Sequence, residues 1–265
     1  MELLQIEEPG ERGDGLEDAG LALGLELTSS GLRLAASVGG NAELVPGEDG
    51  GFELLPALAG YDGASQLAAG ATGLADATAI GIDALAATDA ADIRGASVSD
   101  RVALLVTTAA RLVIQKIGRP IAGAVVVVPL DSTAGLRLAL MHAVEAGGVP
   151  VLRLVEASVA LGYGGGLDRL EEGAYLHLAS VPSGVALARL ELAGGQIRLV
   201  GGGVARHVDE LPELIAAEAP VKALLAPGLA GAEAIAAAAN LPLLDGFDGA
   251  ERAVIGAALF AEAVG

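Results

Sequence analysis

The sequence contains no cysteine and very few aromatic residues. Without cysteine, disulfides, thiolate metal sites and cysteine nucleophiles are all excluded. Aromatic residues make up 2% of the 265 residues, whereas hydrophobic residues together make up 53%. Leucine, valine and alanine must therefore fill the core. Because each of these side chains buries little area, at about 25 cal/mol per Å², stability has to come from many modest contacts.

Positive charge is also scarce. The chain has 15 basic and 34 acidic residues, and its formal net charge is −19 at pH 7. This balance argues against nucleic acid and anionic membranes as partners, since both attract basic surfaces. An acidic surface that only keeps the protein dispersed is one interpretation, and a basic protein partner is the other.

Long apolar runs are missing as well. The most apolar stretch, IAGAVVVVPL at 121–130, is too short to span a bilayer and contains Pro129. Residues 1–20 are acidic where a signal peptide is basic, and their composition predicts a loose or irregular lead-in. We therefore expect a cytoplasmic, soluble protein.

Hydrophobic periodicity divides the first half of the chain into short elements. From Leu21 onward, apolar and polar residues alternate, which is typical of strands joined by glycine-rich turns. Helical spacing follows at 97–118, and the β-branched run at 123–129 predicts a buried strand. A second helix, a second buried strand and a short helix are expected before residue 165. Residues 64–97 lack clear periodicity and predict one or two short strands or helical turns.

The second half of the chain repeats this order. Three strands are expected over 174–203, then a helix, a strand, a helix, a strand at 241–246 and a closing helix. Two copies of a strand meander followed by α/β crossovers indicate a duplicated layout. We expect a lead-in over 1–20, a first lobe over 21–165 and a second lobe over 166–265, each with a mixed sheet and flanking helices.

This layout resembles the nucleotide-binding domain of the seventy-kilodalton heat-shock (DnaK-type) chaperones, within the actin-like ATPase superfamily. The segment VLRLVEASVALGYG at 151–164 is similar to the family's R-I-I-N-E-P-T-A-A-A-L-A-Y-G, and GAERAVIGAAL at 249–259 is similar to its closing helix. The resemblance implies a two-lobed, shortened actin-like (ribonuclease H-like) α/β fold. We expect the family's base-closing helical subdomain and its substrate-binding domain to be missing from this chain.

The segment GLELTSSGLRLA at 24–35 looks like the family's first phosphate-binding hairpin. The resemblance places the acidic residue that orients the magnesium shell at Glu26, the turn glycine at Thr28, and two hydroxyl residues at Ser29 and Ser30. It places a second carboxylate of the cleft at Glu156. The residues by themselves are also compatible with an ordinary hydroxyl-rich turn and with ordinary hydrogen-bonded or solvated carboxylates.

The second hairpin departs from the family's pattern. The family's aspartate falls on His177, its glycines on Ala179, Ser180 and Val181, and its threonine on Pro182. Glycines there let the backbone approach phosphates and donate N–H groups. A β-branched valine and a proline without an N–H do not provide this.

Positive side chains are missing where the resemblance implies a lysine that stabilises the transferring phosphoryl group. No lysine or arginine occurs from Leu34 to Ile93. We therefore expect no basic residue near the first hairpin and no cation in this part of the cleft, which would raise the barrier to phosphoryl transfer. On the adenosine side, Gly228 is the remaining candidate contact.

Other motifs carry little chemistry. The three histidines lack the spacing of a zinc site, and no Ser–His–acid arrangement can be assembled from spacing alone. The run GGGVARH at 201–207 is expected to be a loop, and GYGGG at 162–166 a hinge between the lobes.

The sequence thus predicts a degenerate chaperone-like ATPase domain with a vestigial nucleotide cleft. It would bind another protein or regulate one, hydrolyse little or no ATP, and need no cofactor. Apolar cleft walls exposed by the missing insert could contact that partner. The alternative is an active ATPase or nucleotide switch of the same family, with ATP and magnesium as ligands. No metal site, nucleic-acid partner or membrane partner is expected.

Overall fold

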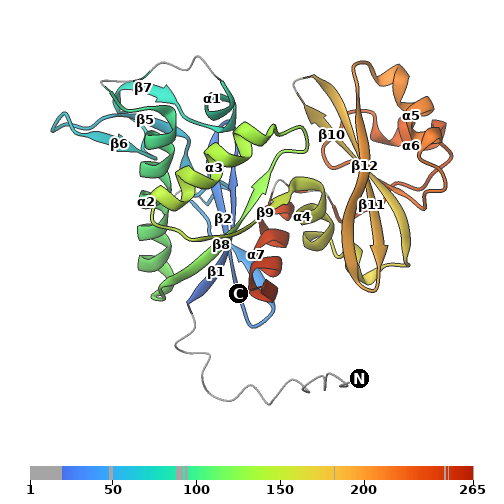
Figure 1. Ribbon diagram of the computed structural model, residues 1–265, viewed down its shortest axis with the longest axis horizontal. Helices are drawn as coiled ribbons and strands as arrows, with labels where there is room; N and C mark the ends of the chain where they lie inside the picture. The colour runs from blue at the N-terminus through green and yellow to red at the C-terminus, as the bar shows by residue number, and fades with distance from the viewer. Residues whose placement is uncertain are drawn as a thin grey trace, which may run out of the picture.

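The structure is a computed structural model with a mixed α/β fold, whose helices and sheets are shown in Figure 1. It describes residues 20–47, 50–87, 92, 95–181, 183–247, 249 and 251–264. The predicted lead-in lies almost entirely outside the described residues, as does Pro182. Within this part of the chain, no helix combines the length and the apolar character needed to cross a bilayer.

Among the described residues, the first sheet has six strands. They are β1 (Leu21–Leu27), β2 (Gly31–Val38), β3 (Asn41–Leu44), β4 (Leu55–Pro56), β8 (Ile121–Val128) and β9 (Val151–Glu156). Their order is β3-β2-β1-β8-β9, with β4 beside β2. β2 is antiparallel to β1, whereas β8 is parallel to both β1 and β9. Strand β8, between β1 and β9, ends in a run of four valines, and both of its faces are buried there.

Helices cover both faces of this sheet. On one face, the leucines of β1 at 21, 23, 25 and 27 share a core with α2 (Val98–Ile117) and α3 (Ala134–Ala146). On the other face, Gly24 lies against α7 (Arg252–Val264). The predicted start of α2 is confirmed, since Ser97 and Asp100 form a capping box.

The second sheet consists of β10 (Gly173–Val181), β11 (Gly184–Ala193), β12 (Gln196–Ala205) and β13 (Leu224–Leu225). Its order is β12-β11-β10-β13, and β13 is the strand parallel to β10. If strands are counted in chain order within each sheet, the first sheet reads third, second, first, fifth, sixth, with the fourth beside the second, and the second sheet reads third, second, first, fourth. Both sheets therefore start with an antiparallel three-strand meander whose first strand has a later, parallel neighbour. Helices α5 (Leu211–Ala217) and α6 (Ala232–Ala238) share a core with this sheet.

Smaller elements complete the described part of the chain. The region from 64 to 87 does form short elements, as predicted. β5 (Leu58–Tyr61), β6 (Leu67–Ala69) and β7 (Ala75–Ala79) make a small sheet, and α1 (Ile82–Ala86) follows. Short 3₁₀ turns lie at Leu167–Arg169 and at Val208–Glu210.

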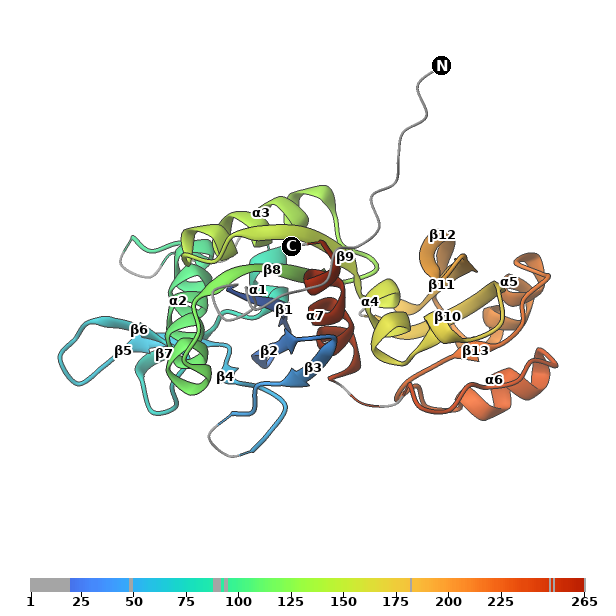
Figure 2. The same ribbon diagram turned by 90° about the horizontal axis from the view of Figure 1, so that it is seen from below.

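Helices α4 (Ala157–Gly164) and α7 cross between the two large sheets, as Figures 1 and 2 both show. Their backbones touch through glycines: a Cβ at Gly256 would overlap the carbonyl oxygen of Ala160, and one at Gly164 would overlap that of Arg252. The close contact between α4 and α7 therefore depends on residues without side chains.

The structure differs from three of the expectations for individual segments. The run at 201–207 is not a loop, because residues 201–205 belong to β12 and the backbone of β11 approaches too closely for a side chain at Gly202. Residues 162–164 of the predicted hinge are the end of α4. The strand expected at 241–246 is reduced to one bridge, between Leu243 and Leu224.

Candidate functional site

In the hairpin between β1 and β2, backbone N–H groups of the turn donate hydrogen bonds to other atoms of the turn. Thr28 Oγ1 accepts hydrogen bonds from the N–H of Gly31, at 2.9 Å, and of Ser30, at 3.3 Å. The N–H of Thr28 donates to the Gly31 carbonyl at 2.8 Å. This is the behaviour of a hydroxyl side chain in a turn, and it leaves few donors that could point at a ligand.

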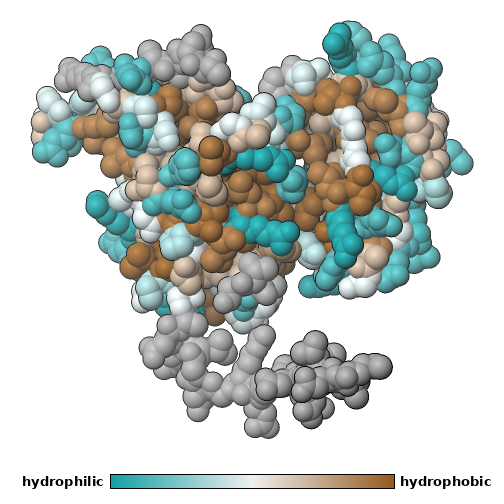
Figure 3. Space-filling model, viewed as in Figure 1, coloured by the Kyte–Doolittle hydropathy of each residue, from teal (hydrophilic) through white to brown (hydrophobic). Residues whose placement is uncertain are grey.

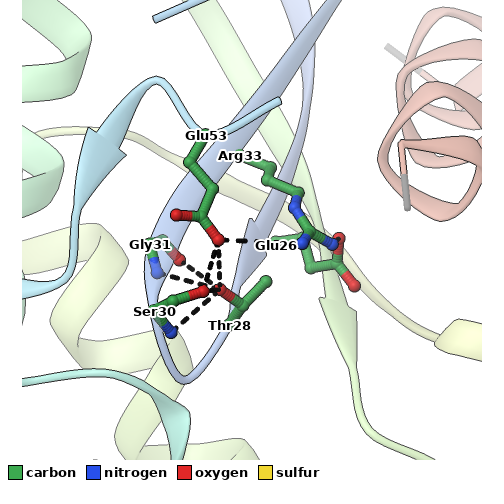
Figure 4. A network of polar contacts seen from close by, with 6 residues as sticks. All are labelled: Glu26, Thr28, Ser30, Gly31, Arg33 and Glu53. Carbon is green, nitrogen blue, oxygen red and sulfur yellow. Dashed lines mark hydrogen bonds and ion pairs between the residues drawn. The ribbon is translucent and has the colours of Figure 1, made fainter. Parts of the chain in front are cut away.

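A carboxylate of the same chain lies on the hydroxyl groups of this hairpin (Figure 4). Ser30 Oγ donates to Glu53 Oε1 at 2.5 Å, and Thr28 Oγ1 donates to the same oxygen at 3.3 Å. Gly31 makes room for this contact, since a Cβ there would lie 2.5 Å from the Glu53 carboxyl carbon. The anion held by the hairpin is therefore the Glu53 side chain.

Glu26 is paired with Arg33. The β1–β2 register places the two residues opposite each other, and Arg33 Nη1 donates to Glu26 Oε2 at 3.2 Å. Arg33 Nη2 also lies 3.7 Å from Glu53 Oε1. Burial raises the pKa of Glu26, while the charge and hydrogen bond of Arg33 act in the opposite direction.

The expectation that no basic residue lies near the first hairpin is wrong. Arg33 comes three residues after Ser30 and contacts both carboxylates of the site. The stretch without lysine or arginine begins only at Leu34, one residue after Arg33, so it says nothing about charge at the hairpin turn. In this network one guanidinium, that of Arg33, contacts two carboxylates, those of Glu26 and Glu53.

Glu156 does not join Glu26. In the sheet register, Glu26 is level with Val127, and Val127 is level with Val155. Glu156 is the next residue and so faces the opposite side of the sheet. There its Oε1 accepts a hydrogen bond from Arg137 Nη1 of α3 at 2.9 Å.

A small cavity lies where the first hairpin meets the second sheet. Its polar lining comes from Glu26, Thr28, Ser29, Ser158, His177 and Ser180, and Val181 also lines it. The two hairpins that the resemblance paired are therefore neighbours in space. The volume is about 270 Å³, below the range of about 300–1,000 Å³ that is usual for small-molecule sites. Gly228 does not line this cavity; it lies in an exposed turn after β13 with φ of +65°.

The sequence did not predict a polar pair that lines this cavity. Ser158 Oγ of α4 and His177 Nδ1 of β10 are 2.7 Å apart, and both residues are buried. Burial lowers the pKa of His177 to about 4, so its imidazole is neutral at physiological pH. The sequence feature that could have pointed to this pair is Ser158, which is the one serine in the largely apolar segment ASVALGYG.

The described residues contain no cluster of three or more histidine, aspartate or glutamate side chains that could hold a metal ion. A scan of protein families finds no family model that matches the chain. A search of curated proteins likewise finds no match. The function is therefore inferred from the geometry of the site and from the similarity of short segments to the chaperone motifs.

Replacing Arg33 with methionine is expected to lower the free energy of unfolding at pH 7 by about 1–2 kcal/mol, because two carboxylates would face each other without a cation. Urea denaturation would measure the loss. The double variant Glu26→Gln/Arg33→Met should regain most of it. Equal stability of Arg33→Met and the wild type would show that the pair contributes nothing.

Proposed function

We propose that this chain is a shortened actin-like domain, related to the nucleotide-binding domain of the seventy-kilodalton heat-shock chaperones, which acts as a protein-binding or regulatory module with little or no ATP hydrolysis. The actin-like fold in this proposal is supported by a feature common to the two large sheets, an antiparallel three-strand meander whose first strand pairs with a later, parallel strand. It is also supported by the crossing of α4 and α7 between them, since these helices carry the two most specific sequence similarities.

The Glu53 carboxylate on the hairpin hydroxyls carries the functional part of the proposal. A triphosphate at this hairpin would meet a negative charge within hydrogen-bond distance of Ser30 Oγ. The turn's N–H groups at Ser30 and Gly31 already donate to Thr28. Like charges at this distance repel, so the residues of the hairpin do not fit a phosphate group.

The Arg33 guanidinium argues against a magnesium shell at Glu26. A carboxylate that orients the shell of a divalent ion needs its oxygens free for metal-bound water. Here Arg33 occupies Glu26 Oε2 at 3.2 Å, and Arg137 occupies Glu156 Oε1 at 2.9 Å on the other face of the sheet. Each candidate carboxylate therefore has an internal cation.

A second function remains supported by one observation. Glu26, Ser29 and Ser180 line the same cavity between the sheets, which is where the resemblance would place a nucleotide. An active ATPase or nucleotide switch would use these residues after Glu53 had moved off the hairpin.

Thermal unfolding with and without millimolar ATP and magnesium tests the proposal. We expect no change in Tm. Ligand at 100 times its dissociation constant would stabilise the native state by about 2.7 kcal/mol, or roughly 5–10 °C for a domain of this size. A clear upward shift, together with phosphate release that Glu26→Ala abolishes, would establish the second function instead.

A further inference from the structure

A groove unrelated to the hairpin cavity lies where β9, α4, β12 and α7 meet. Its volume is about 900 Å³. Three arginines line it from three different elements: Arg153 from β9, Arg169 from the 3₁₀ turn at Leu167–Arg169, and Arg198 from β12. The chain has a net charge of −19, so three arginines in one groove suggest a surface that binds an acidic group.

These arginines have no acidic partners within the described part of the chain. The ion pairs there involve Arg33, Arg137, Arg189 and Lys222. Of the two acidic residues that line the groove, Glu156 is bonded to Arg137, and Asp168 is the other. The groove therefore offers an excess of unpaired positive charge.

The floor of the groove is apolar and aromatic. The Tyr163 and Phe260 rings are 5.7 Å apart, and the Arg153 guanidinium lies 5.2 Å from the Phe260 ring centroid. Leu199 and Leu259 also line it. On the face shown in Figure 3, hydrophilic side chains lie among apolar ones over β9, α4 and α7. The matching ligand is a peptide segment that is both acidic and apolar.

We propose that the occupant of this groove is the chain's own N-terminal segment, residues 1–19. This segment has seven acidic residues and one basic residue. Its first eight residues, MELLQIEE, place Leu3, Leu4 and Ile6 between glutamates. The apolar side chains would contact the aromatic floor, and the carboxylates would pair with the arginines.

The segment is attached close enough to reach the groove. It precedes β1, and β1, β8 and β9 are parallel neighbours. The register places Arg153 level with Val125, which is level with Gly24. Measured across the sheet, Arg153 is therefore two strands, or about 10 Å, from the strand that Gly20 precedes. Measured along the strands, it is about four residues, or about 13 Å, from Gly20. Nineteen residues can extend to about 60 Å.

Paramagnetic relaxation in the full chain tests the proposal. Because the protein has no cysteine, Gln5→Cys gives a single site for a nitroxide label. We expect the amide signals of Tyr163, Ile197 and Leu199 to broaden. The broadening should fall at least about fivefold in Arg153→Glu/Arg198→Glu, and also in the labelled chain without these substitutions in 1 M NaCl, where the Debye length is about 3 Å.

The matched control is Arg111→Glu/Arg206→Glu, which changes two exposed arginines outside the groove and shifts the net charge by the same amount. It should retain the broadening. No broadening at the groove, or equal broadening in both double variants, would overturn the proposal. Broadening of an isotope-labelled, nitroxide-free chain by a spin-labelled second copy would also overturn it, because the segment would then act between molecules.

Discussion

Replacing Gly256 with alanine should lower the free energy of unfolding by about 3 kcal/mol. In an ordinary helix interior this change stabilises by about 1 kcal/mol, because alanine is the better helix former. Here the added Cβ would overlap the Ala160 carbonyl oxygen and approach the Gly164 backbone nitrogen to 2.6 Å. Backbone atoms cannot rotate away as a side-chain end can, so α4 and α7 must separate.

Gly135→Ala is the matched control for this prediction. Gly135 also lies within a helix, α3, but its nearest neighbour to an added Cβ is the Thr133 hydroxyl at 3.8 Å. It should be unchanged in stability or slightly more stable. Urea denaturation measures both changes, and Gly256→Ala should also lower Tm by roughly 6–12 °C. If both alanines had the same effect, the close crossing of the helices would be wrong.

The elements that could be predicted are those whose signal is local. The valine run of β8, the helical spacing of α2 and the cap formed by Ser97 and Asp100 each depend on neighbours in sequence. The three-strand meander that opens each large sheet followed from the same periodicity. The 201–205 segment was misjudged because its glycines suit a turn, whereas β12 tolerates them beside a register shift in β11.

The site was less predictable, for two different reasons. The Glu26–Arg33 pair could have been found, because counting outward from the Thr28–Gly31 turn places these residues opposite each other. Glu53 could not: it reaches Ser30 across 23 residues of chain through a tertiary contact. The pairing of Ser158 with His177 likewise depends on how α4 packs against the second sheet.

Acid should destabilise this protein through His177, by about 3 kcal/mol between pH 6.5 and pH 4. An unfolded histidine titrates near pH 6.5, whereas burial holds the pKa of His177 to about 4 in the folded state. Between these values the unfolded state binds more protons, so the free energy of unfolding falls as the pH falls. Above pH 6.5 the contribution is complete, and below pH 4 it is lost.

His177→Asn isolates this effect, because asparagine keeps a polar group near Ser158 but does not titrate. Urea denaturation at several pH values should show a flatter dependence between pH 6.5 and 4 in this variant. His207→Asn, which changes an exposed histidine, should retain the wild-type slope. A slope that is the same in all three proteins would show that His177 is not buried as a neutral imidazole.

Glu26 acts on the same curve with the opposite sign. Its folded-state pKa is raised by burial, so the stability linked to it is present at low pH and is lost as the pH rises through that value. At low pH the Glu26 carboxylate becomes protonated, which removes the cost of burying its charge. The same fall in pH favours the unfolded state at His177, because an exposed histidine gains a proton that the buried one does not. Glu26→Gln should make the fall in stability toward pH 4 steeper, and His177→Asn should make it shallower. The two variants together separate the contributions of two ionisable groups that line one cavity.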